Sequence, residues 1–170
     1  MKKLVCVLLL LSSVLMSNAQ ENHIEISLQQ DLRLLTVGDG NGNNPVTINV
    51  ISRLEVPFYN YTKSHFASYA SVEYADLSDQ NYQRYALGIG YVIDNLSGKF
   101  GAGTYVDFGK IYREDQGFYS YSISGELSYK VNNHLKLICT SQLTHRKDLK
   151  ELYDSREYVI SGFVGIKYRF

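Results

Sequence analysis

Ser141 and His145 are the two residues whose types and spacing come nearest to nucleophilic chemistry, because an imidazole can activate a nearby hydroxyl. They lie in a segment in which polar and apolar residues alternate, and that pattern is typical of a strand. Four residues along a strand span about 13 Å, far beyond hydrogen-bond reach. No third group is placed to orient the histidine. We therefore predict no catalytic residue and no enzyme activity.

Metal and cofactor sites are not indicated either. His23, His65 and His134 stand singly in the sequence, whereas a metal site needs clustered donors. The glycine-rich segment 38–44 contains one carboxylate, Asp39, which is too few for a calcium-binding loop. We predict no metal and no cofactor.

Charged residues recur on one face of successive alternating segments. The polar face includes Glu25, Arg33, Arg53, Glu55, Glu73, Arg84, Asp107, Glu126, Lys136 and Lys167, with Gly88, Gly90, Gly101 and Gly103. An unpaired buried charge costs several kcal/mol, so charges of both signs on a buried face are expected to pair. We predict a charge network inside a barrel, formed by Glu25, Arg53, Glu55, Glu73, Arg84, Asp107 and Glu126.

Eight segments of alternating polarity, separated by turn signals, are expected to position these charges. They cover residues 23–35, 46–58, 65–75, 82–93, 99–108, 119–130, 135–144 and 158–170. Segments of about ten residues can cross a membrane at a tilt, and bacterial barrels have an even number of strands starting at eight. The connections after the second, fourth and sixth segments are tight, and those after the first, fifth and seventh are longer. Short and long connections are typical of periplasmic and outer ends respectively.

The aromatic residues favour an apolar face that contacts lipid over one that lines a soluble cavity. They fall into two groups near opposite ends of the strands, as interfacial girdles would. The periplasmic group is Phe58, Phe66, Tyr91, Phe100, Tyr129, Tyr168 and Phe170, and the outer group is Tyr74, Tyr82, Phe108, Phe118, Tyr119 and Tyr158.

The first 19 residues have the pattern of a cleavable secretory signal, with Lys2 and Lys3 before an apolar run and small residues before Ala19. We predict cleavage after Ala19 and one barrel domain over residues 20–170. Loss of two lysines from a chain of net charge zero leaves about −2, which does not suggest a nucleic-acid partner. The remaining chain keeps only Cys139, so it cannot form an internal disulfide.

The last six residues, Gly165 to Phe170, together with the length and the signal, resemble the small OmpX/Ail-type and OmpA-like outer-membrane barrels. This resemblance implies that Tyr168 and Phe170 form the terminal signal recognised by the barrel assembly machinery. It also implies a monomer in contact with outer-membrane lipid and lipopolysaccharide. The outer loops look short and lack the protruding strand extensions of the adhesin members.

The sequence thus predicts an all-β protein: an eight-stranded antiparallel up-and-down transmembrane β-barrel in the outer membrane of the Gram-negative cell envelope. Its expected role is non-enzymatic, structural or surface-interacting, through residues 112–116 and 147–157, with a closed, charged interior. The alternatives are a lipid-modifying outer-membrane enzyme, a narrow pore along Glu126 and the neighbouring serines, and a soluble periplasmic ligand-binding barrel.

Overall fold

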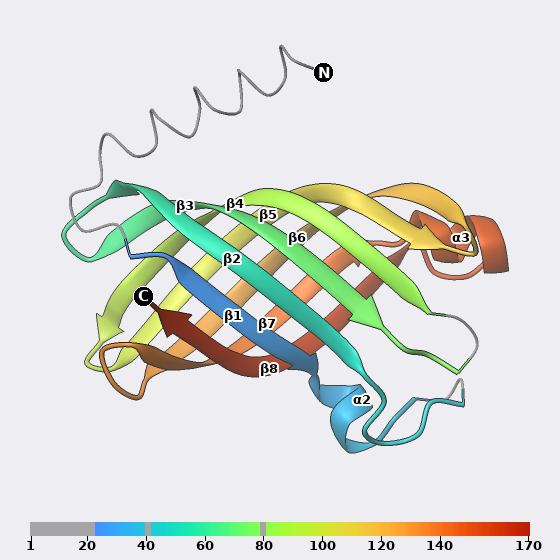
Figure 1. The fold of residues 1–170 in the computed structure, drawn as a ribbon, viewed down its shortest axis with the longest axis horizontal. Helices are drawn as coiled ribbons and strands as arrows, with labels where there is room; N and C mark the ends of the chain where they lie inside the picture. Colours follow the sequence, from blue (N-terminus) through green and yellow to red (C-terminus); the bar gives the residue numbers. More distant parts are fainter. Residues whose placement is uncertain (1–22, 40–41, 79–80) are drawn as a thin grey trace, which may run out of the picture.

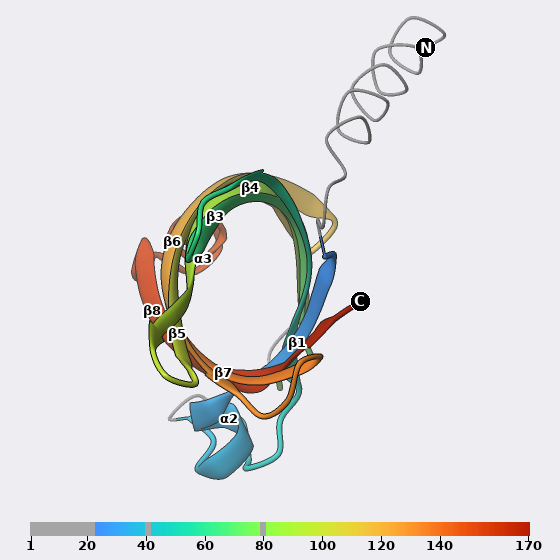
Figure 2. The same ribbon diagram turned by 90° about the vertical axis from the view of Figure 1, so that its left-hand side faces the viewer.

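The computed structural model describes residues 23–39, 42–78 and 81–170. Eight antiparallel strands close into a barrel in which each strand pairs with its neighbours in sequence, and β8 pairs back with β1. This confirms the predicted all-β, up-and-down topology, and Figure 2 shows the closed ring of strands. The predicted signal, residues 1–19, lies outside the described residues. The strands are β1 (Glu25–Asp31), β2 (Asn49–Asn60), β3 (Ser64–Ala75), β4 (Tyr82–Ser97), β5 (Phe100–Arg113), β6 (Gln116–Lys130), β7 (Leu135–His145) and β8 (Tyr158–Arg169).

The two ends of the barrel differ. His23 and Phe170 lie together at one end, where His23 Nδ1 is 3.0 Å from the Phe170 carbonyl oxygen, and we call this the terminal end. The short helices α2 (Leu32–Thr36) and α3 (Lys147–Tyr153) lie at the opposite end, the helix end (Figure 1). Within the described part of the chain, no helix is long and apolar enough to cross a membrane.

Alternation along each strand puts polar side chains inside the barrel and apolar side chains outside. In β6, Ser122, Ser124 and Glu126 are buried. Ile123 and Leu127, which alternate with them along the strand, are 55% and 63% exposed. A period of two produces this division because successive side chains of a strand point to opposite faces. The interior is therefore polar and the outer surface is apolar.

The predicted first strand ends earlier than expected. We predicted a strand over residues 23–35, but β1 ends at Asp31 and α2 begins at Leu32. The Asp31 carboxylate accepts a hydrogen bond of 2.9 Å from the Leu34 backbone N–H, which caps the helix. Arg33 consequently lies exposed on α2 and does not face the interior.

The predicted loop between the fifth and sixth strands is instead a long hairpin. Pairing of β5 with β6 continues to Arg113 opposite Gln116, whereas β6 pairs with β7 only as far as Ser122. The tip of the hairpin therefore extends beyond the end of β7, so the expectation that strand extensions are lacking is wrong. Glu114 and Asp115 form the turn with φ of 50° and 58°, the backbone of a two-residue hairpin loop.

Two residues predicted for the outer aromatic girdle lie inside the barrel. Tyr82 and Phe118 are 3% and 6% exposed. Each lies two residues from an inward-facing side chain, Arg84 or Ser120, and strand periodicity therefore turns it inward as well.

Tyr105 fills the space left by two glycines that face the interior. A Cβ atom added to Gly90 would lie 2.6 Å from Tyr105 Cε1, and one added to Gly103 would lie 2.8 Å from Tyr105 Cε2. The ring is 1% exposed and packs edge-on against Tyr69 at 5.6 Å between centroids. These glycines thus allow a large aromatic side chain to lie across the barrel interior.

Candidate functional site

A central charge cluster joins four strands inside the barrel. Lys167 Nζ lies 2.8 Å from Glu55 Oε1 and 2.5 Å from Glu126 Oε1. Arg53 Nη1 lies 3.6 Å from Glu55 Oε1 and 3.3 Å from Glu126 Oε2, so each acid contacts both cations. The Tyr105 hydroxyl donates to Glu55 at 3.1 Å and accepts from Lys167 at 3.1 Å. Two acids and two bases therefore balance in charge in a region closed to water.

The Arg53 guanidinium also contacts aromatic rings. Its Cζ lies 4.3 Å from the Tyr105 ring centroid and 5.0 Å from that of Tyr69. A desolvated cation over an aromatic face gains about 2 kcal/mol, which offsets part of the cost of its burial. This packing, together with the ion pairs, fills the barrel at its centre.

A second cluster lies at the terminal end. Lys136 Nζ is 2.9 Å from Glu25 Oε1 and 2.8 Å from Asp94 Oδ1, and Arg169 Nη2 is 2.6 Å and 2.7 Å from the same two oxygens. His65 Nδ1 lies 2.8 Å from Asp94 Oδ2. Because β1, β3, β4, β7 and β8 each contribute one of these side chains, the cluster links opposite walls of the barrel.

A third group lies between the centre and the helix end. Arg84 pairs with Asp107 and donates to the Ser120 hydroxyl at 3.0 Å, while the Tyr69 hydroxyl donates to Asp107 at 2.9 Å. Glu73 accepts a hydrogen bond from the buried Tyr82 hydroxyl. These contacts continue the polar interior from the central cluster toward the helices.

Asp148 of α3 anchors the helix end. This fully buried carboxylate accepts two hydrogen bonds from Arg146, at 2.9 Å and 2.8 Å, and lies 3.5 Å from Arg113 Nη1. The Arg146 guanidinium lies 4.2 Å from the Tyr82 ring centroid. Burial alone would lower the pKa of Arg146, but the surrounding Tyr82 and Asp148 groups raise the pKa overall. The first residues of α3 are therefore fixed to the barrel wall.

The two segments expected to make surface contacts, residues 112–116 and 147–157, lie against each other. The Tyr153 hydroxyl of α3 donates to the Glu114 carboxylate in the hairpin turn, and the Arg113 guanidinium lies 5.1 Å from the Tyr153 ring centroid. Partial burial and the bond to Glu114 raise the pKa of the Tyr153 phenol. On the exposed side of α3, the hydrogen bond from Lys150 lowers the pKa of Asp154. The sequence suggested two separate surfaces, and the structure brings them into one.

The structure places all seven side chains of the predicted network inside the barrel, but distributes them over separate groups. Glu25 belongs to the cluster at the terminal end, and Arg53, Glu55 and Glu126 to the central one, while Arg84, Asp107 and Glu73 lie nearer the helix end. The predicted network omits Lys136 and Lys167, although both belong to the predicted polar face, and it also omits His65, Asp94 and Arg169. Turn signals in residues 94–98 predict that the fourth strand ends before Asp94, but β4 continues to Ser97.

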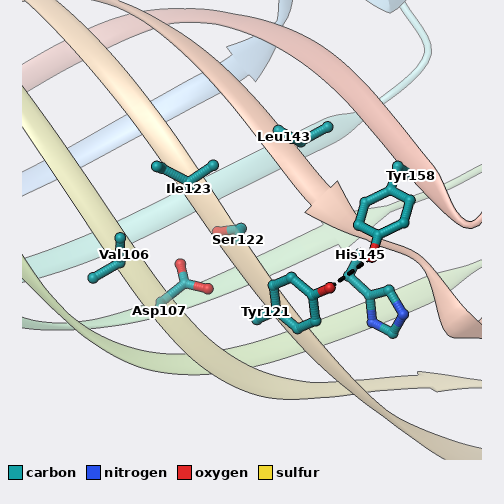
Figure 3. Close-up of a pocket in the computed structure, with 8 residues that line it drawn as sticks. All are labelled: Val106, Asp107, Tyr121, Ser122, Ile123, Leu143, His145 and Tyr158. Atoms are coloured by element: carbon teal, nitrogen blue, oxygen red, sulfur yellow. Dashed lines mark hydrogen bonds between the residues drawn. The ribbon is translucent and has the colours of Figure 1, made fainter.

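Ser141 and His145 do not form a catalytic pair in the structure. Both face outward from β7, and His145 Nε2 lies 2.9 Å from Glu157 Oε1. Figure 3 shows His145 beside Tyr121 and Tyr158, whose hydroxyls are 2.7 Å apart, in a groove of about 270 Å³. The imidazole stacks on the Tyr121 ring at 4.6 Å between centroids. The groove is lined mainly by aromatic and aliphatic side chains, and among the described residues no serine hydroxyl forms a hydrogen bond with the His145 ring.

Among residues 23–39, 42–78 and 81–170, no three His, Cys, Asp or Glu side chains gather closely enough to hold a metal ion. Tyr168 and Phe170, predicted as an assembly signal, are exposed, and their rings lie 5.0 Å apart. The His134 ring stacks on Tyr168 at 6.0 Å. The chain terminus therefore presents an aromatic patch on the outside of the barrel.

Comparison of the structure with solved proteins identifies similar barrels. Neisserial surface protein A (NspA) aligns with a TM-score of 0.56 and 9% identity, over 87% of this chain and 95% of that one. The outer-membrane protein Ail of Yersinia pestis, in a phospholipid bilayer nanodisc, aligns with a TM-score of 0.53 and 15% identity, over 88% of this chain and 100% of that one. No protein-family model and no curated protein sequence matches the chain. At these identities the likeness extends to the fold alone: the chain has the fold of the small eight-stranded outer-membrane barrels.

Proposed function

We propose that this chain is an integral protein of the cell outer membrane, with the terminal end in the periplasm and the helix end outside the cell. The observation that carries the proposal is the inverted distribution of polarity. Every strand contributes large exposed apolar side chains, while acids and bases pair inside. A soluble monomer rarely exposes an apolar surface that surrounds the whole molecule. The short connections at the terminal end are those expected for periplasmic turns.

The proposed role is non-enzymatic, and it combines structural support of the envelope with contacts made at the cell surface. The hairpin tip of β5 and β6 and helix α3 form the surface that would face outward, beside a pocket of about 330 Å³ lined in part by Arg113, Arg146 and Tyr153. Outer-membrane lipid and lipopolysaccharide would surround the barrel as its partners, and the barrel would be monomeric. Tyr168 and Phe170 would engage the barrel assembly machinery during insertion. A soluble ligand-binding barrel is disfavoured because its cavity would be apolar.

Membrane fractionation followed by electrophoresis in detergent tests the location and the closed barrel together. We expect the protein in the outer-membrane fraction, with the unheated sample migrating faster than the boiled one. Hydrogen bonding between every neighbouring pair of strands, including β1 with β8, resists detergent until it is heated. A soluble periplasmic protein without a heat-dependent shift would contradict the proposal.

The interior contacts predict that the barrel conducts no ions. Three groups of paired charges lie at successive levels along the interior, and an eight-stranded barrel is just wide enough for side chains to fill it. We expect no conductance steps in planar bilayers from the wild-type protein. Glu126→Ala removes the acid between Arg53 and Lys167. If the wild-type protein conducts ions and this variant changes the conductance, the result would support a narrow pore instead.

A further inference from the structure

An apolar groove of about 500 Å³ lies on the outside of the barrel near the terminal end. It crosses the wall from the end of β4 to the start of β7, and its lining includes Leu96, Phe100, Leu127, Tyr129, Leu137 and Cys139. Leu96, Phe100 and Leu127 are each more than half exposed. The volume is within the range of pockets that hold small molecules, roughly 300–1,000 Å³. The groove is therefore both concave and apolar, as a binding site for an apolar chain would be.

A cation lies next to this groove. Lys99, in the turn between β4 and β5, places its ammonium nitrogen 5.9 Å from the Tyr129 ring centroid, and the Tyr129 and Phe100 rings are 5.2 Å apart. The Lys99 carbonyl accepts a hydrogen bond of 2.8 Å from the Lys130 backbone N–H, so a second lysine adjoins the same turn. In the described part of the chain, no carboxylate pairs with either ammonium group. The cation at the groove is thus not neutralised by the described residues.

We propose that this groove binds an anionic glycerophospholipid of the inner leaflet of the outer membrane, with an acyl chain along the groove and the phosphate at Lys99. The inference rests on the proposed membrane location, which puts the terminal end at the periplasmic interface. A zwitterionic lipid would bind less strongly, because the positive charge of its headgroup is repelled by the Lys99 ammonium group. A twofold contact with a second copy would bring two uncompensated Lys99 side chains to one interface, which like-charge repulsion disfavours.

The absence of tryptophan from the chain allows a direct test, because a single introduced tryptophan is the only indole present. Phe100→Trp places the probe in the groove. Ile26→Trp is the matched control, at an exposed position on β1 near the same end. Each variant is reconstituted in bilayers, and its fluorescence is quenched with brominated phosphatidylglycerol or brominated phosphatidylcholine. We expect phosphatidylglycerol to bind about fivefold more strongly at the groove probe, with no preference at the control, since one basic residue near a membrane is worth about 1 kcal/mol.

Lys99→Gln in the Phe100→Trp background should abolish the preference while the heat-dependent shift remains. Quenching of both probes without a preference, or a preference that survives Lys99→Gln, would overturn the lipid site and leave the membrane location intact. Absence of quenching at both probes would instead contradict the membrane location. Protection of the groove probe alone, with disulfide cross-linking through Cys139, would show that a second copy occupies the groove and would overturn the proposal.

Discussion

Lys167→Met is expected to destabilise the barrel by about 3–5 kcal/mol, the usual effect of removing one partner from a buried ion pair. Lys167 is 1% exposed and contacts both Glu55 and Glu126. Without it, Arg53 alone would face two carboxylates that water cannot reach. The measurement is the urea concentration at which half of the protein loses its compact, fast-migrating form.

Two further variants test the cause of this effect. Lys147→Met removes a solvent-exposed partner of Glu151 on α3 and should change stability by less than about 0.5 kcal/mol. Glu126→Gln added to Lys167→Met restores one acid to one base in the central cluster, and part of the lost stability should return. Equal effects of Lys147→Met and Lys167→Met would show that the interior ion pairs contribute little.

Gly90→Val is expected to destabilise the barrel by about 3 kcal/mol or to prevent folding. The added side chain would overlap the Tyr105 ring, and a closely packed interior tolerates little overpacking. The three atoms nearest to an added Cβ all belong to the Tyr105 ring, and two of them, Cε1 at 2.6 Å and Cγ at 3.3 Å, lie on either side of the closest, Cδ1. The ring has nowhere to move, since Gly103 lies against its other edge and Glu55 and Glu126 hold its hydroxyl. The same urea titration provides the measurement.

The control for this substitution is Gly125→Val, at an outward-facing position on β6 where an added Cβ meets nothing within 4 Å. It should be neutral within about 0.5 kcal/mol or slightly stabilising, because β-branched residues favour strands. In a Tyr105→Val background, Gly90→Val should become much less harmful. Equal tolerance of valine at both glycines would show that the Tyr105 ring does not pack against Gly90 in solution.

Within the paired strands, the side on which a residue lies was predictable from the sequence because a strand has a strict period of two. That rule holds even for Tyr82 and Phe118, where residue type suggested the outer surface and the backbone turned the ring inward. For these residues, the alternation of the strand was the stronger guide. Aromatic residues are common at both membrane interfaces and barrel interiors, so their type alone does not distinguish the two.

The ends of the strands were less predictable. Asp31 is a residue type that caps helices, and Lys147 and Glu151 have the spacing of a helical pair, but the alternation around Asp31 and the polarity of residues 146–156 favour a strand and a loop instead. The turn at Glu114 and Asp115 contains neither glycine nor asparagine, and Asp115 is the one residue in it that favours such turns, so the local signal for a two-residue hairpin is weak.

The partners within the interior could not be derived from the sequence. Lys136 lies 111 residues from Glu25 in the sequence, and the two meet because β7 and β1 both pair with β8 and direct these side chains into the same end of the barrel. Alternation establishes that both side chains point inward, but the level of each along the barrel depends on strand register and tilt. Those quantities arise from the closure of the whole sheet.

The last strand supplies one cation to each of two clusters: Lys167 at the centre and Arg169 at the terminal end. The acids that these cations neutralise lie on β1, β2, β4 and β6, which are all synthesised earlier. A chain interrupted before β8 would therefore hold an excess of negative charge at both levels, as well as lacking the strand that closes the ring. The strand that closes the ring thus also supplies the cations that neutralise both clusters.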